Sequence, residues 1–160
     1  MLSRRRHSPY ARRASLHNGQ VSMGFFENPN LARFTHAALR IIIGLNFMTH
    51  GAQKMFGAFG GVDGHGTAVP LAGLFGVAAI LELVGGFLIL IGLFTRPVAF
   101  ILAGEMAVAY FMAHVPQGGI IPVVNHGEPA VLHCFVFLFL AFNGPGPFSV
   151  DASRRRASVT

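Results

Sequence analysis

Four apolar stretches dominate this chain and decide what it can fold into. They occupy about residues 35–55, 70–94, 97–115 and 129–142. A helix needs about 20 residues to cross a hydrocarbon core of about 30 Å, and the first three stretches meet that length. The fourth is short, because its residues extend only about 21 Å at a helical rise of about 1.5 Å each. The pattern predicts an all-α integral membrane protein, a bundle of four transmembrane helices.

Four buried helices of a soluble domain are the alternative interpretation. Soluble domains carry about 25% charged residues, whereas this chain is 11% charged and 52% hydrophobic. Helices buried in soluble domains also normally keep one polar face. Residues 83–94 and 130–142 contain no charged residue at all. Both observations favour lipid over water around the apolar segments.

Basic residues are concentrated on one side of the predicted membrane. Arginines precede the first stretch, and Arg96 lies in the short connection between the second and third. The C-terminal tail adds Arg154, Arg155 and Arg156, whereas the other side is offered only Lys54. Because cytoplasmic flanks carry the excess of Lys and Arg, both termini are predicted to be cytoplasmic.

The segments that flank the predicted bundle are basic. Residues 1–33 are predicted to form a disordered cytoplasmic tail, residues 34–145 the membrane domain and residues 146–160 a second cytoplasmic tail. The Arg-rich beginning also fits a mitochondrial transit peptide, and Met23 is an alternative translation start. Beside apolar spans, basic tails are expected to face anionic lipid headgroups. We therefore expect a lipid bilayer as partner and no nucleic acid.

Ionisable side chains inside membrane spans are costly and usually face the bundle interior or a wet cavity. Each predicted span contributes at least one of them. The candidate polar cluster comprises Arg40, His50, Lys54, Glu82, Glu105 and His133. Gly44 and Gly51 share a helix face with Arg40 and Lys54, and small residues there permit close helix approach. Gly85 and Gly86 follow Glu82 and predict the same on the second span.

Two interpretations of this cluster stay open. An ion pair of Arg40 with Glu82 or Glu105 would fix the register of the helices, because a lone charge inside a membrane span costs about 3 kcal/mol. A functional cluster would instead handle protons, a quinone or a small substrate. The histidines form no close pair on one helix, and Cys134 is the single cysteine. We therefore expect neither a metal site nor a haem.

Short polar and glycine-containing motifs succeed one another along the apolar part of the chain. They are residues 40–44 (RIIIG), 50–57 (HGAQKMFG), 81–86 (LELVGG), 92–97 (GLFTRP), 105–110 (EMAVAY) and 125–128 (NHGE). In this order and spacing, over about residues 34–145, the chain resembles the DoxX family of small bacterial membrane proteins. The positions that match the family's recurrent polar residues are Arg40, His50, Lys54, Glu82, Arg96 and Glu105. The match does not establish their chemical roles.

The resemblance implies a multi-pass, four-helix protein of the bacterial cytoplasmic (inner) membrane. Because members are linked to quinol oxidase accessory subunits and membrane oxidoreductase assemblies, it implies a subunit of a membrane-associated oxidoreductase or quinone-linked redox system. Its partners would be other membrane or redox proteins, its candidate cofactor a quinone, and a homo-oligomer stays open. With Cys134 alone, any dithiol chemistry would belong to a partner. A non-enzymatic scaffold or assembly subunit and a small-solute or lipid carrier are the alternatives.

Overall fold

The protein is all-helical in the part that the computed structural model describes, residues 27–158, where no strand occurs. The elements in chain order are α1 (Pro29–Phe56), η1 (Ala58–Gly60), α2 (Leu74–Ile80), η2 (Leu81–Gly85), α3 (Gly86–Ile91), α4 (Thr95–Ala109), η3 (Tyr110–His114), α5 (Val115–Gly118), α6 (Glu128–Asn143) and α7 (Val150–Ala157). η2 and η3 are π-helical turns inside otherwise continuous helices. α2, η2 and α3 therefore form one rod, and α4, η3 and α5 form another. The predicted all-α class is confirmed.

The first helix is longer than the hydropathy pattern indicates. The side chain of Asn28 accepts a hydrogen bond of 2.9 Å from the N–H of Asn30, and Pro29 occupies the first turn, where its missing N–H is not needed. The helix ends at Gly57, which adopts a left-handed φ of 67°. Residues 29–33 are thus helical, and the expected N-terminal tail is shorter by these residues. Its remaining part, residues 1–26, lies outside the described residues.

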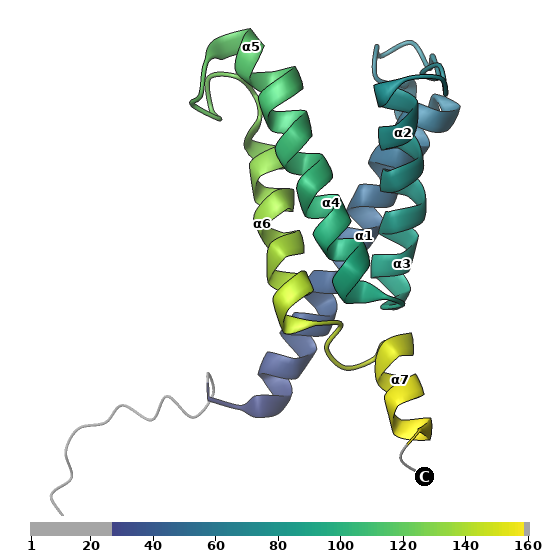
Figure 1. Ribbon diagram of the computed structural model, residues 1–160, viewed down its shortest axis with the longest axis vertical. Coiled ribbons are helices and arrows are strands. Elements are labelled where there is room, and N and C mark those ends of the chain that lie inside the picture. Colours follow the sequence, from purple (N-terminus) through teal and green to yellow (C-terminus); the bar gives the residue numbers. More distant parts are fainter. Residues whose placement is uncertain (1–26, 159–160) are drawn as a thin grey trace, which may run out of the picture.

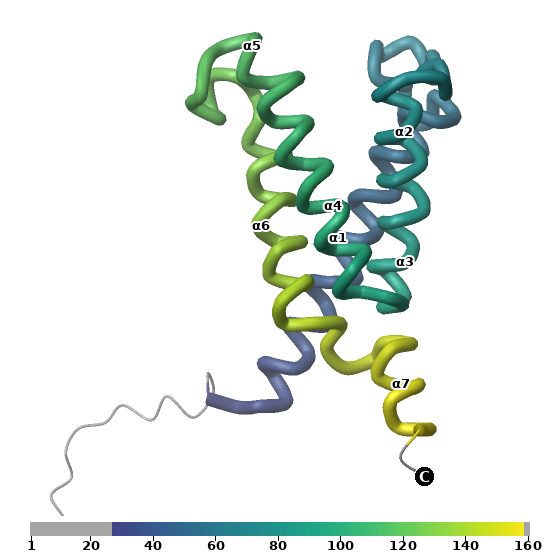
Figure 2. Tube along the Cα trace, viewed as in Figure 1, coloured from purple at the N-terminus to yellow at the C-terminus, as the bar shows by residue number. Residues whose placement is uncertain are grey.

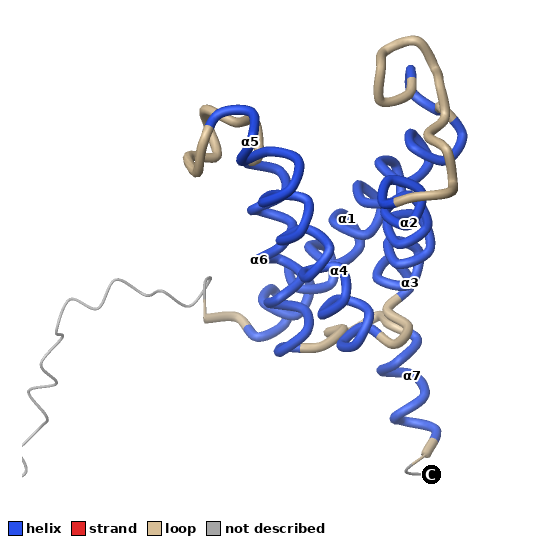
Figure 3. Tube along the Cα trace, turned by 45° about the horizontal axis from the view of Figure 1, so that its top comes forward, coloured by secondary structure: helices blue, strands red, loops and turns tan. Residues whose placement is uncertain are grey.

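The helices associate in two pairs (Figures 1 and 2). α1 packs along the α2–η2–α3 rod, and the α4–η3–α5 rod packs along α6. The pairs meet near the connection from α3 to α4 and diverge toward the end that carries residues 57–73 and 119–127, as the turned view in Figure 3 also shows.

Glycines bring α1 and the α2–η2–α3 rod into backbone contact. A Cβ atom on Gly44 would lie 2.6 Å from the backbone nitrogen of Leu90, and one on Gly86 would lie 2.8 Å from that of Met48. Ordinary contacts of a Cβ atom begin at about 3.4 Å. The predicted close approach through small residues is therefore confirmed for these positions.

The apolar core lies where the two pairs meet. Phe47 of α1 and Phe137 of α6 pack edge to face with ring centroids 4.8 Å apart, next to the buried Ile89 and Leu102. On the outside, large apolar side chains are exposed along every rod; examples are Ile42, Val84, Phe100 and Phe135. Such an apolar exterior suits lipid and would be an aggregation liability in water.

Among residues 27–158, two helices are long and apolar enough to cross a bilayer, Leu74–Ile91 with 18 residues and Thr95–Gly118 with 24. α6 is also apolar but has 16 residues. α1 has 28 residues and carries Arg33, Arg40 and Lys54. The first of these spans ends, and the second begins, at the short connection of residues 92–94.

The C-terminal segment folds back onto this connection. The carboxylate of Asp151 accepts hydrogen bonds from the N–H groups of Phe94 (3.0 Å) and Thr95 (2.9 Å), and the N–H of Asp151 donates to the carbonyl of Gly92 (2.9 Å). Asp151 thereby caps the beginning of α4. Part of the expected tail of residues 146–160 is thus ordered as α7, whose N-cap is Ser149.

Candidate functional site

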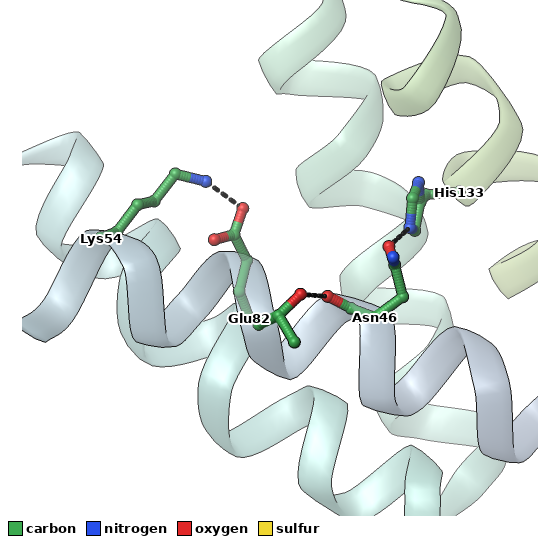
Figure 4. Close-up of polar contacts among 5 residues, drawn as sticks. Asn46, Lys54, Glu82 and His133 are labelled. Atoms are coloured by element: carbon green, nitrogen blue, oxygen red, sulfur yellow. Dashed lines mark hydrogen bonds and ion pairs between the residues drawn. The ribbon is translucent and has the colours of Figure 1, made fainter. Parts of the chain in front are cut away.

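A buried ion pair joins the two helices of the first pair. Lys54 in the last turn of α1 donates a hydrogen bond to Oε1 of Glu82 in η2 (Figure 4). The Glu82 side chain is only 3% exposed. Its other oxygen, Oε2, is buried and has no hydrogen-bond partner among the described residues. One ammonium group therefore balances the charge of Glu82 but leaves an acceptor free.

Glu105 lies across from this ion pair on α4. Both of its carboxyl oxygens are buried, and neither has a hydrogen-bond partner in the described part of the chain. Glu105 is close enough to Glu82 and Lys54 to interact with both electrostatically. A buried polar atom without a partner costs about 1–3 kcal/mol. Native structures contain few such groups. A bound ligand that donates hydrogen bonds, or a proton that the carboxyl group exchanges, would explain why Glu105 is buried here.

A second polar group lies about two helical turns before Lys54 on α1, at Asn46. The Nε2 atom of His133 on α6 is 3.0 Å from Oδ1 of Asn46, and its Nδ1 donates to the carbonyl of Pro129 at 2.6 Å. Figure 4 shows Asn46 and Lys54 projecting from the same helix toward different partners. The ring of His50 lies edge to face with His133, with centroids 6.1 Å apart. These contacts connect the two helix pairs.

The acidic and basic side chains face a cleft between the diverging pairs. Its larger part has a volume of about 440 Å³ and is lined by Lys54, Glu82, Glu105 and His114 together with apolar side chains. A smaller part of about 140 Å³ continues past Lys54 and Glu82 to His50 and His133. We call these two parts together the polar cleft. Its apolar lining includes the exposed side chains Leu74, Phe75, Val108 and Met112, so the cleft opens among residues that suit lipid.

Both π-helical turns lie at the polar cleft. η2 contains Glu82, and η3 ends at His114. In a regular α-helix His114 would lie half a turn away from Glu105, nine residues earlier, and would face away from it. The wider π-turn rotates the residues after it, so that both side chains line the same cleft. π-turns are frequently found at functional sites.

Asn125 fixes the connection that supports His114. Its side chain donates to the carbonyl of Gly119 at 2.7 Å and accepts from the N–H of Gly127 at 2.8 Å. The backbone carbonyl of Asn125 lies 3.2 Å from Nδ1 of His114. The connection after α5 thus holds the imidazole at the mouth of the cleft.

Arg40 does not belong to this site, and its expected pairing with Glu82 or Glu105 is wrong. The fully buried guanidinium group binds four backbone carbonyls instead. Nε donates to Pro145 (2.9 Å), Nη1 to Ile89 (2.8 Å) and to Leu90, and Nη2 to Phe148 (2.8 Å). Arg40 lies level with the end of α3, at Ile89 and Leu90, whereas Glu82 lies further along the same rod in η2.

Arg96 acts in a similar way at a neighbouring helix end. Its Nη1 donates to the carbonyls of Ala141 (3.0 Å) and Phe142 (2.7 Å) in the last turn of α6. The terminal carbonyls of a helix lack intrahelical partners and carry partial negative charge. Arg40 and Arg96 therefore close the C-terminal ends of α3 and α6, and both lie away from the polar cleft.

Comparison with known proteins agrees with this architecture. The family described as DoxX matches residues 35–115, which include Lys54, Glu82 and Glu105. The chain belongs to the DoxX family. A relative described as an uncharacterized protein of Haemophilus influenzae is 41% identical over 117 residues, covering 72% of this chain and 87% of the relative. No solved structure matches the chain. As a DoxX protein, the chain is a membrane protein.

The polar cleft of this DoxX protein gathers most of the residues that the sequence singled out. Those that line it are His50, Lys54, Glu82, Glu105 and His133. Sequence reasoning missed Asn46 and His114. Asn46 precedes His50 by one helical turn, which was a usable signal. Among residues 27–158, no group of three or more His, Cys, Asp or Glu side chains is placed to hold a metal ion.

Proposed function

We propose that this DoxX protein crosses the bacterial cytoplasmic membrane four times as a helix bundle, with both termini in the cytoplasm. α1, the two interrupted rods and α6 would each cross once. The distribution of charge supports this topology. Arginines gather at the end that carries α7, whereas residues 57–73 and 119–127 at the opposite end contain no Lys or Arg. α6 is short, and local thinning of the bilayer would accommodate it.

This topology is tested with reporter fusions to the full chain. Green fluorescent protein at the C-terminus should fluoresce, because it folds in the cytoplasm. Alkaline phosphatase inserted in residues 57–73 or 119–127 should be active, because it requires an oxidising compartment. Active phosphatase at the C-terminus would overturn the proposed orientation.

The polar cleft is proposed to bind the headgroup of a quinone, with the protein acting as a subunit of a membrane redox system. The observation that carries this proposal is the set of three buried carboxyl oxygens that have no hydrogen-bond partner within residues 27–158, beside one ammonium group. They occupy a cavity that opens among exposed apolar side chains. A ligand with a polar head and an apolar tail, arriving from the lipid, fits both parts of this lining.

The side chains of the cleft have complementary roles toward such a headgroup. The Lys54 ammonium can donate a hydrogen bond to a quinone carbonyl, and the free oxygens of Glu82 and Glu105 can accept from quinol hydroxyls. A quinone takes up two protons and two electrons when it becomes a quinol. The two acids would exchange the protons, whereas the electrons would come from a partner redox protein. The single Cys134 cannot form a dithiol couple.

The acids provide the decisive variants. Glu82→Gln and Glu105→Gln should keep expression and membrane insertion but lower quinone-dependent activity of the membranes by at least about 100-fold, the lower end of the range for a proton-transfer group. Glu128→Gln is the matched control, because Glu128 is exposed at the start of α6 outside the cleft. Protein purified in a gentle detergent should retain a quinone, identified by mass spectrometry.

Two outcomes would contradict the redox proposal. One is a purified protein without quinone; the other is unchanged quinone-dependent activity in both acid variants. If Glu82→Gln and Glu105→Gln alter only the recovery of partner proteins in a pull-down, the protein is a scaffold. If a different amphipathic molecule co-purifies and is lost in the variants, it is a carrier.

A further inference from the structure

A second hollow lies at the arginine-rich end of the molecule, between the α3–α4 connection and α7. It has a volume of about 350 Å³. Three arginines line it: Arg96 from the first turn of α4, and Arg154 and Arg155 from α7. Asp151 and Phe94 also line it. We call this hollow the arginine pocket; it is separate from the polar cleft.

The arginines of α7 are held in place by backbone contacts. The hydroxyl of Ser149 accepts from the N–H of Ala152 at 3.1 Å and so caps α7. The hydrogen bonds of Asp151 to Gly92, Phe94 and Thr95 then tie the first turn of α7 to the beginning of α4. The guanidinium carbon of Arg154 lies 5.6 Å from the ring centroid of Phe94, within reach of a cation–π interaction. The backbone that carries Arg154 and Arg155 is thus anchored to the beginning of α4.

The single acid in the pocket does not cancel this charge. Burial alone would raise the pKa of Asp151, but hydrogen bonds from Thr95 and Phe94 hold that pKa below its usual value. Both carboxylate oxygens are already engaged with these N–H groups. Three guanidinium groups against one carboxylate leave the pocket cationic. Its occupant should be an anion, and guanidinium groups match phosphate oxygens especially well.

The position of the pocket selects the kind of anion. The apolar span Leu74–Ile91 ends beside it and the span Thr95–Gly118 begins there, so the pocket lies at the edge of the hydrocarbon layer. Phe94 and Phe148 are 56% and 78% exposed at this level. Both have left-handed backbones, with φ of 50° and 55°, a conformation that costs about 1 kcal/mol or more for a bulky residue. These turns present two aromatic rings where acyl chains begin.

We propose that the arginine pocket is a binding site for an anionic phospholipid, with the lipid phosphate between Arg96, Arg154 and Arg155. The acyl chains would lie against Phe94 and Phe148. A basic pocket next to membrane helices is the chemistry by which anionic headgroups are recognised. The site is independent of what the polar cleft binds.

The test measures lipid binding to the full chain in detergent by native mass spectrometry. Phosphatidylglycerol should bind the wild type more tightly than phosphatidylcholine with the same chains. Each basic residue near an anionic lipid surface contributes about fivefold in affinity. Arg155→Gln should therefore weaken phosphatidylglycerol binding about fivefold, and the double variant Arg154→Gln/Arg155→Gln about 25-fold.

Arg156→Gln is the matched control, because Arg156 is exposed on the same helix but does not line the pocket. The affinity of the Arg156→Gln variant for phosphatidylglycerol should stay within about twofold of that of the wild type. Equal losses in Arg155→Gln and Arg156→Gln would show diffuse charge attraction and overturn the site. Equal binding of phosphatidylcholine, or full competition by inorganic phosphate at the lipid's own concentration, would overturn the assignment to an anionic phospholipid. Size-exclusion profiles verify that these exposed substitutions leave the fold intact.

Discussion

Gly44→Ala should destabilise the first helix pair, although alanine is the better helix former. The added Cβ would lie 2.6 Å from the backbone nitrogen of Leu90 and 2.9 Å from the carbonyl oxygen of Gly86. The first distance is about 0.8 Å shorter than the 3.4 Å at which ordinary contact begins. Because both neighbours are backbone atoms, no rotamer change can relieve the clash, and α1 must move away from α3.

The size of the effect follows from two opposing terms. Overpacking of this kind costs about 1–3 kcal/mol, whereas replacing glycine by alanine inside a helix gains about 1 kcal/mol. The net loss is therefore up to about 2 kcal/mol, which lowers the unfolding temperature of a chain of this size by up to about 8 °C. Thermal unfolding in detergent, followed by the circular dichroism of the helices, measures this shift.

Gly104→Ala is the control for helix propensity. A Cβ on Gly104 would meet no atom within 4 Å, because this exposed position of α4 faces away from the other helices. Its unfolding temperature should stay equal or rise by up to about 4 °C. If Gly44→Ala were as stable as Gly104→Ala, the inference that α1 and α3 touch through their backbones would be refuted.

Three further predictions concern charged side chains. Lys54→Met should lower the free energy of unfolding by about 3–5 kcal/mol, because it leaves Glu82 buried and unpaired. In thermal melts in detergent, the double variant Lys54→Met/Glu82→Gln should regain most of this stability. If the losses of the two single variants were additive, the ion pair would be contradicted. Arg40→Lys should lower the free energy of unfolding by about 3 kcal/mol or more, because an ammonium group cannot reach four carbonyls. The control Arg33→Lys, at an exposed position, should have the melting temperature of the wild type. Asp151→Asn should cost about 1 kcal/mol at pH 7 through the weakened cap of α4. The folded-state pKa of Asp151 is lowered, so its contribution is complete above the unfolded pKa near 3.8 and disappears as the pH falls through the lower folded value. The melting temperatures of wild type and Asp151→Asn should therefore converge below about pH 4; a constant difference down to pH 2 would contradict the role of the charge.

Hydropathy and helical spacing predicted the helices and their glycine contacts. A long apolar run is recognised from many residues together and does not depend on any one of them. The helix around Glu82 and the one around Glu105 could therefore be placed within a few residues. Gly44 and Gly86 could be assigned to a contact because small residues matter only where backbones meet. The same reasoning placed the ionisable side chains on inward faces.

The partners of the charges could not be read from the sequence. Arg40 binds main-chain carbonyls, which every residue type offers, so its acceptors 49 to 108 residues away leave no pattern in the side chains. His114 reaches the cleft through a π-turn, which changes helical phase without a compositional signal. α7, in contrast, was missed despite signals: Ser149 at its N-cap, Asp151 in its first turn and basic residues in its last.

The hydrogen bonds of Arg40 impose an order on the completion of the molecule. Its acceptors Pro145 and Phe148 are synthesised 105 and 108 residues later. Until then the guanidinium of the first helix has only the end of α3 to bind. A chain that stops before Pro145 therefore leaves two of the four carbonyl contacts of Arg40 unmade, so the first helix is completed only when the last segment reaches it.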